Sequence, residues 1–301
     1  MRWPIGAHWA DKAYPEAIDL GFSWCFVSAT DLINTSPDKV ANIQEFIASG
    51  LDFVLATSWH TESMLLNSEG AWDQYLYWVR DAMWAHGLMR RCLAAIYDDE
   101  FLSRLWAKAG DHAVFPPAIW PNVSRCRPND PGVIAEAAHI LADRMRDMRR
   151  IFGADMPPGG IGLSETEAYD WPNVVGQDFW SLDLYRGRPG WYIPTTEKVH
   201  EYYAAAAEKG LRLMPVIPVF SDGGHAAVSV GDLAECYLPL LERHGSRIDW
   251  LAVFCLHHPS QYDARHEANG HKGRGILQLP YDRRDAVRWL TRTYGQRRRT
   301  T

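Results

Sequence analysis

The chain alternates from end to end between short continuous apolar runs and segments with helical spacing. Strands buried on both faces are typically unbroken apolar runs, whereas strands with one solvated face alternate apolar and polar residues. Eight runs of the first kind are present, and these predict a parallel sheet covered by helices. They lie at 3–9, 23–29, 52–59, 93–100, 160–167, 179–185, 213–220 and 250–258.

Helical patterns fill most intervals between these runs. The segment 36–50 begins with Ser36 and Pro37, which suit the N-cap and the first helical position, and it ends on Gly50. Further helices are predicted at 195–210, 231–245 and 281–295, each ending in glycine. In 71–87, five apolar residues recur on one helical face, namely Trp72, Tyr75, Leu76, Val79 and Met83. Only the interval between the fifth and sixth runs is too short for a full helix.

Eight strand–helix units predict an α/β fold, a single (β/α)8 barrel over residues 1–295, with a basic tail at 296–301. An open doubly wound sheet is the rival architecture. No glycine-rich phosphate loop follows the first strand, which argues against its dinucleotide-binding form. The longest predicted loops, 101–131, 186–194, 221–230 and 259–280, all follow strands. In a barrel they would lie at the carboxyl-terminal face, where such enzymes place their active sites.

Charge and cysteine content limit the binding partners and the cellular compartment that we expect for this protein. A net charge of -6 argues against a broad nucleic-acid or anionic-membrane surface, and no run of 18 apolar residues suggests a membrane span. Residues 1–16 lack the apolar core of a secretion signal. The five cysteines are widely spaced and form no C-x-x-C pair, so we expect buried, reduced thiols. These features predict a cytoplasmic protein, although export by another route stays open.

Polar and aromatic residues collect at the carboxyl ends of the predicted strands. In a parallel barrel these ends converge on one mouth, so we expect the side chains to face a shared pocket. Glu165 and Glu167 share a face by alternation, and only one of them is expected at the chemistry. After the seventh strand, the loop carries Ser221, Asp222 and His225. The strand-end residues are His8, Trp9, Trp59, His60, Asp98, Asp99, Glu100, Glu165, Glu167, Asp183, Tyr185, His257 and His258.

The fourth strand ends in three consecutive acids within "IYDDEF". Cleavage of a glycosidic bond needs one carboxylic acid to protonate the leaving oxygen and a second carboxylate to attack the sugar or activate water. Glu100 is the predicted acid/base, since like charge from Asp98 and Asp99 would raise its pKa. Asp183 or Glu165 is the predicted second carboxylate. Salt bridging by Asp98 and Asp99, and structural hydrogen bonding by the histidines, are the alternatives.

Aromatic residues are abundant, with 14 tryptophans and 13 tyrosines. Flat rings stack on the apolar faces of sugars, and many rings must also fill the core. Trp120 and Trp191 lie in the long loops and are candidate sugar platforms, with simple loop packing as the alternative. Substrate-binding roles are further predicted for Tyr185, His8, His60 and His258, with Trp9 and Trp59 beside them.

The motifs "AIYDDEF", "DFWSLDLY" and "LMPVIPVF" resemble the fourth, sixth and seventh strands of (β/α)8-barrel glycoside hydrolases. The resemblance in architecture spans most of the chain, whereas the matching motifs comprise only about twenty residues. It implies that Glu100 is the acid/base. In the larger clan an asparagine precedes that glutamate, and Asp99 stands there instead. The clan's nucleophile glutamate at the end of the seventh strand has no counterpart, because Asp222 follows only in the loop. The Asp98-x-Glu100 spacing also resembles chitinase-like and lysozyme-like barrels, which implies that Asp98 orients the acid.

Three functions therefore remain at the level of sequence. The first is a glycoside hydrolase acting on an oligo- or polysaccharide, which requires no metal or other cofactor. The second is a metal-dependent sugar isomerase, lyase or hydrolase, although no H-E-x-x-H motif is present. The third is a non-catalytic carbohydrate-binding barrel. The second would draw its ligands from His8, His60, Glu100, Glu165, Asp183 and His258.

Overall fold

The computed structural model describes most strands and helices of the chain and the turns between many of them. Of residues 98 and 99 it describes the backbone alone. The described residues are 2–7, 12–57, 71–99, 131–162, 176–182, 196–219, 231, 235, 237–254 and 281–296.

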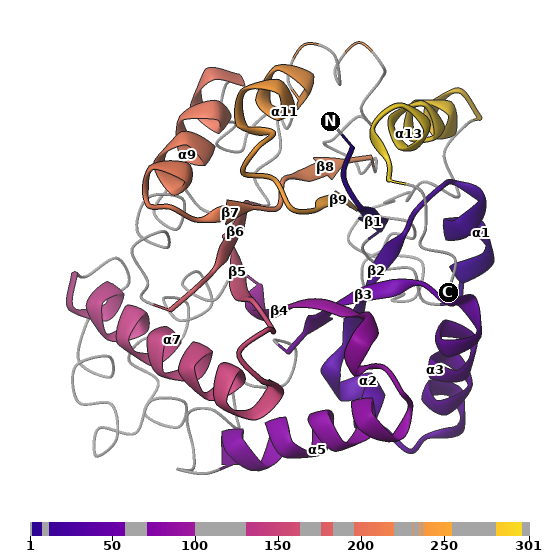
Figure 1. Cartoon of the computed structure of the whole chain (residues 1–301), viewed down its shortest axis with the longest axis vertical. Helices are drawn as coiled ribbons and strands as arrows, with labels where there is room; N and C mark the ends of the chain where they lie inside the picture. The colour runs from indigo at the N-terminus through magenta and orange to yellow at the C-terminus, as the bar shows by residue number, and fades with distance from the viewer. Residues whose placement is uncertain are drawn as a thin grey trace, which may run out of the picture.

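The described strands form one parallel sheet that curls into a ring, with helices around its outside (Figure 1). The strands are β1 (Ile5–Ala7), β2 (Trp24–Ser28), β3 (Asp52–Ala56), β4 (Cys92–Asp99), β5 (Pro158–Gly162), β6 (Phe179–Leu182), β7 (Arg212–Leu213), β8 (Val216–Pro218) and β9 (Leu251–Phe254). Each lies within or overlaps a predicted apolar run, so all eight predicted strand positions are confirmed.

The ring closes through a single interrupted strand. The sheet order runs from β7 through β6 to β1 and ends β9–β8, and β7 and β8 are separated in the chain only by Met214 and Pro215. The Met214 N–H donates to the Trp180 carbonyl at 3.0 Å, and the Pro215 carbonyl accepts from the Ala252 N–H at 2.9 Å. Proline has no N–H for the ladder, so the strand turns from one neighbour to the other at this point. The predicted closed barrel is therefore confirmed, and the open sheet is excluded.

The outer helices include all five that the sequence predicts. They are α3 (Pro37–Ser49), α5 (Ala71–Ala85), α9 (Thr196–Glu208), α11 (Leu238–His244) and α13 (Tyr281–Tyr294). In α5 the five predicted apolar residues are all buried. After α3, Gly50 takes the left-handed conformation with φ 66°. The structure adds α1 (Tyr14–Asp19), α2 (Ala29–Ile33), α7 (Pro131–Phe152) and the 3-10 turn η1 (Met89–Arg91), which the sequence patterns did not predict.

Two hydrophobic layers hold the barrel together. The larger lies between strands and helices, and it includes Tyr97, Trp180 and the apolar face of α5. The smaller consists of alternate strand residues and fills the barrel interior; it includes Trp24, Ile96, Ile161 and Phe179. Two interior aromatics occupy space left by glycines, because a Cβ on Gly6 would lie 2.0 Å from the Trp24 ring and one on Gly159 would lie 2.7 Å from the Phe179 ring. The interior is thus a packed core.

Candidate active site

The parallel pairing of every strand brings the carboxyl ends together at one end of the barrel. β4 ends at Asp99, so Glu100 follows it directly in the chain, and β6 ends at Leu182, so Asp183 follows directly. β1 likewise ends one residue before His8. Active sites of this fold lie at this end, and the predicted site residues follow the strands that lead to it.

Most predicted site residues lie outside the described part of the chain. Asp98 and Asp99 are the last two residues of β4, and the structure describes their backbone. The residues outside are His8, Trp9, Trp59, His60, Glu100, Trp120, Glu165, Glu167, Asp183, Tyr185, Trp191, Ser221, Asp222, His225, His257 and His258. Their roles, including the convergence of His8, His60, Glu100, Asp183 and His258 on one pocket, stay predictions.

An irregularity in β4 sets the backbone position of the acids. Ile96 pairs with Gly159 and Asp99 pairs with Ile161, so three steps along β4 match two along β5. One extra residue in a strand is a β-bulge, and bulges near active sites redirect the end of a strand. The register places Asp99 beside Ile161, a residue of the barrel interior.

Thr57, directly after β3, holds this irregular end of β4. Its hydroxyl is fully buried and lies 2.9 Å from the Ile96 carbonyl oxygen and 2.7 Å from that of Tyr97. Its backbone N–H also donates to the Ile96 carbonyl at 3.1 Å. The bulge disturbs the regular ladder, and a buried carbonyl needs a partner. The Thr57 hydroxyl satisfies this need immediately before the three acids.

The outer side of β4 is fixed by aromatic packing. Tyr97 is fully buried, and its ring meets Trp72 of α5 edge to face at 5.5 Å. Trp72 also packs against Tyr75, with 5.8 Å between ring centroids. Rings in such contacts resist displacement, because each fills a large volume of the core. β4 is therefore held on its outer face and by Thr57 up to the residue before Asp98.

An ion pair joins α2, which follows β2 directly, to α3. Asp31 is mostly buried and binds the Lys39 ammonium at 2.7 Å. Burial, and secondarily the negative charge of Asp31, raise the pKa of Tyr75 well above its usual range. Tyr75 therefore stays a neutral phenol. The sequence patterns did not single out Thr57 or Asp31, and they marked Tyr75 only as part of the apolar face of 71–87. For Thr57, a threonine directly after a strand is the available signal.

The amino-terminal end of the barrel carries charges that are partnered. Arg212, at the start of β7, forms a two-pronged ion pair with Asp249, which precedes β9; one contact is 2.9 Å. Arg149 of α7 pairs with Asp178, before β6, at 2.7 Å. Arginine–carboxylate pairs at this end are typical of structural contacts. These pairs tie adjacent elements together rather than forming a second reaction centre.

Within the described ranges, no three histidine, cysteine, aspartate or glutamate side chains are grouped so that they could hold a metal ion. In the same part of the chain, no helix is long and apolar enough to cross a bilayer. Cys25 is buried, and burial raises the pKa of the Cys92 thiol well above its usual range. Burial is therefore observed for Cys25, and the reduced state of the five cysteines stays a prediction.

No protein-family model matches the sequence, and no curated protein matches it. Solved structures do match the fold. Xylanase B from Clostridium stercorarium is 12% identical with a TM-score of 0.55, over 95% of this chain and 96% of that one. The CBM22–GH10 modules of an endo-1,4-β-D-xylanase from Clostridium thermocellum are 10% identical with a TM-score of 0.60, over 98% of this chain and 67% of that one. A D-psicose 3-epimerase is 11% identical with a TM-score of 0.55, over 98% and 100%.

These similarities show the fold. The chain has the α/β-barrel architecture found in family 10 xylanases and in other barrel enzymes. The resemblance of its strands to those of (β/α)8 glycoside hydrolases is confirmed at the level of architecture, and it identifies no family. Because barrels with this topology host many chemistries, the reaction must be argued from the residues.

Proposed function

We propose that this protein is a glycoside hydrolase that cleaves an oligo- or polysaccharide with Glu100 as the general acid/base. The observation that carries the proposal is the carboxyl end of β4. There, two aspartates end a strand whose backbone is irregular and held by Thr57, and Glu100 follows at once. The fold neighbours support it, because several are xylanases.

The second carboxylate would be Asp183 or Glu165. Asp183 directly follows β6, and Glu165 follows the last residue of β5 by three positions. A separation of about 5 Å from Glu100 would give retention, and about 6.5–9.5 Å would give inversion. The mechanism then needs no metal. Glu100 protonates the leaving oxygen, and the second carboxylate attacks the anomeric carbon or activates the water that does so.

Substrate contacts would come from residues around the mouth. His8, His60, Tyr185 and His258 would bind sugar hydroxyls, and Trp120 or Trp191 would supply a flat surface for a pyranose ring. Replacing each tryptophan by alanine should lower the affinity for substrate more than it lowers the stability of the fold.

The experiment is a screen of purified protein on aryl glycosides and on polysaccharides that include xylan, cellulose and chitin, with detection of new reducing ends. Hydrolysis of at least one substrate without added metal is expected. Binding without hydrolysis on every substrate would contradict the proposal and favour a non-catalytic carbohydrate-binding barrel.

One observation favours a second candidate. The D-psicose 3-epimerase neighbour has the same barrel at a TM-score equal to that of one xylanase. A metal-dependent sugar isomerase would use histidine and carboxylate ligands from the strand ends. Stoichiometric metal that activity requires, with interconversion of free sugars in place of hydrolysis, would support it.

A further inference from the structure

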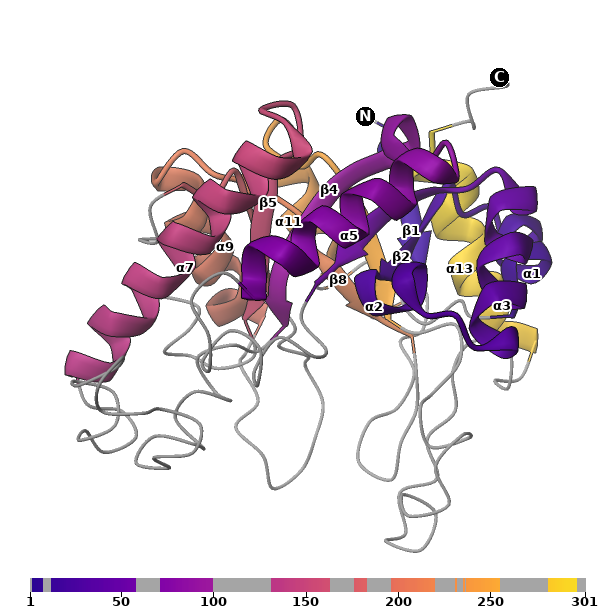
Figure 2. The same ribbon diagram turned by 90° about the horizontal axis from the view of Figure 1, so that it is seen from below.

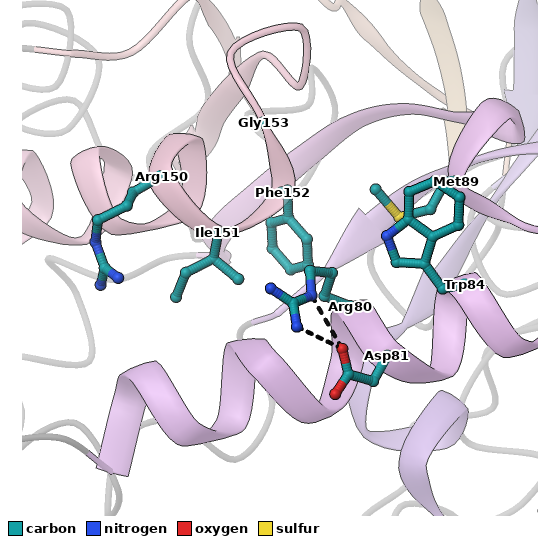
Figure 3. A pocket seen from close by; sticks show the side chains of 8 residues that line it. All are labelled: Arg80, Asp81, Trp84, Met89, Arg150, Ile151, Phe152 and Gly153. Atoms are coloured by element: carbon teal, nitrogen blue, oxygen red, sulfur yellow. Dashed lines mark hydrogen bonds and ion pairs between the residues drawn. The ribbon is translucent and has the colours of Figure 1, made fainter.

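A second surface feature lies far from the mouth. Between α5 and α7, at the amino-terminal end of the barrel, a hollow of about 570 Å³ opens to solvent (Figure 3). The two helices lie side by side outside the strands in both views (Figures 1 and 2). The hollow is placed at this end because Met89 precedes β4 and Gly153 precedes β5. Its lining residues are Arg80, Asp81, Trp84, Met89, Arg150, Ile151, Phe152 and Gly153.

One of the residues that line the hollow is a solvent-exposed tryptophan, Trp84. Trp84 is 65% exposed, although exposing a large apolar ring to water is unfavourable. Its ring lies beside Met89, and Phe152 lies on the opposite side of the hollow (Figure 3). A flat apolar ring next to open volume is suited to stacking on a flat apolar face of a ligand.

The polar groups of the hollow are already neutralised in pairs. The Arg80 guanidinium donates two hydrogen bonds to Asp81, at 3.0 and 2.6 Å. Arg150 binds Asp73 at 2.6 Å and Asp147 at 3.2 Å. An anionic ligand would therefore find no uncompensated cation here. Asp81 remains 63% exposed and Arg80 32% exposed, so acceptors and donors face solvent.

The shape of the hollow and the chemistry of its lining residues together indicate which class of ligand it can bind. A neutral, polyhydroxylated ring needs one flat apolar surface and neighbouring hydrogen-bond donors and acceptors, and the hollow offers both. Its volume lies within the ~300–1,000 Å³ range of small-molecule pockets. A stable protein partner would instead need about 800 Å² of contact per side, much more than one exposed tryptophan provides.

We infer that the hollow between α5 and α7 is a second carbohydrate-binding site, with Trp84 as its stacking platform and the Arg80–Asp81 pair as its hydroxyl-binding group. This inference rests on the proposed function for its choice of substrate class. The site would hold part of a neutral polysaccharide chain while the mouth at the other end of the barrel acts on another part or on another chain.

The test compares two exposed tryptophans on the same helix. Trp84→Ala removes the platform, and Trp78→Ala is the matched control, because Trp78 is 53% exposed and does not line the hollow. Both are made in a Glu100→Gln background and in the otherwise unchanged chain. Depletion binding is measured on insoluble xylan, cellulose and chitin, and tryptophan fluorescence is titrated with xylohexaose, cellohexaose and chitohexaose.

The expected result is adsorption to at least one polysaccharide, weakened about five- to ten-fold by Trp84→Ala and unchanged by Trp78→Ala. Hydrolysis of a small aryl glycoside should be the same in Trp84→Ala as in the unchanged chain. Equal adsorption by all variants, or no adsorption to any polysaccharide, would overturn the inference. Self-association that Trp84→Ala abolishes, without a change in adsorption, would also overturn it and assign the face to a second copy of the chain. If the protein adsorbs through Trp84 and hydrolyses nothing, the second site stands and the proposed function fails.

Discussion

At the scale of single residues, Thr57 links the fold to the proposed chemistry. Its hydroxyl shares one proton between two carbonyls of β4, at 2.9 and 2.7 Å, in a fully buried position. Removing a buried partner costs about 1–3 kcal/mol, because the remaining group is left without a hydrogen bond. Thr57 has no need to touch a substrate to matter, since it fixes the backbone that leads to Asp98, Asp99 and Glu100.

Thr57→Val should therefore lower the free energy of unfolding by about 1–3 kcal/mol and reduce kcat more than it raises KM. Thr57→Ser keeps the hydroxyl and should recover most of both. The matched control is Thr291→Val, because the buried Thr291 hydroxyl on the outer helix α13 donates a comparable hydrogen bond to the Leu20 carbonyl, at 2.7 Å. Urea unfolding and steady-state kinetics measure the two effects. A valine variant with unchanged stability and kcat would remove Thr57 from this role.

At the scale of elements, β1 and β2 can pack closely because Gly6 has no side chain and leaves room for the Trp24 ring. A Cβ on Gly6 would lie 2.0 Å from the Trp24 ring, well inside any real contact. Gly6→Ala should destabilise the barrel by about 1–3 kcal/mol or more through overpacking. Trp24→Leu in the same chain should recover part of that loss by making room. Thermal unfolding of the single and double variants checks this, and additive losses in the double variant would show that the two side chains do not compete for space.

Helices α9 and α11 contact each other, and each carries a largely buried histidine, His200 on α9 and His244 on α11. Burial, then the nearby charges of Arg243 and His200, lower the pKa of His244 below its ordinary value of about 6.5. Because the unfolded chain then binds a proton at higher pH than the folded one, stability falls as pH drops below about 6.5.

Unfolding free energy measured from about pH 7 to about pH 5 should therefore decline less steeply for His244→Gln than for the unchanged chain. His86→Gln is the control, since His86 is exposed. A decline that the His244 variant leaves unaltered would show that acid loss of stability arises at other groups.

At the scale of the whole molecule, the alternation of eight apolar runs with helical segments predicts a parallel sheet covered by helices and favours a barrel. Unbroken apolar runs and the apolar face of α5 arise from burial, which sequence patterns report directly. The closure through Pro215, the bulge in β4 and the Arg212–Asp249 pair depend on contacts between distant segments, so no local pattern contains them. The hollow beside Trp84 is of the same kind: helical spacing marks the buried face of α5, but it does not say what the exposed face meets on α7.

The polar residues at the strand ends could be predicted from the sequence only in part. Their order along the chain predicts a shared end of the barrel, and the parallel strands confirm that end. Which carboxylate acts as acid and which as nucleophile depends on separations that spacing in sequence cannot give, and so these roles remain proposals.

The most direct test is the Glu100→Gln variant on two substrates with the same sugar, one with a poor leaving group and one with a nitrophenol. The amide keeps the shape and removes the proton. General acid catalysis contributes about 10²–10⁴-fold, so hydrolysis of the poor-leaving-group substrate should fall by at least that factor. The bond-breaking step with the nitrophenyl substrate, which needs little protonation, should be much less affected. Equal, severe losses on both would indicate a nucleophile or a metal ligand, and near-normal activity on both would contradict the account.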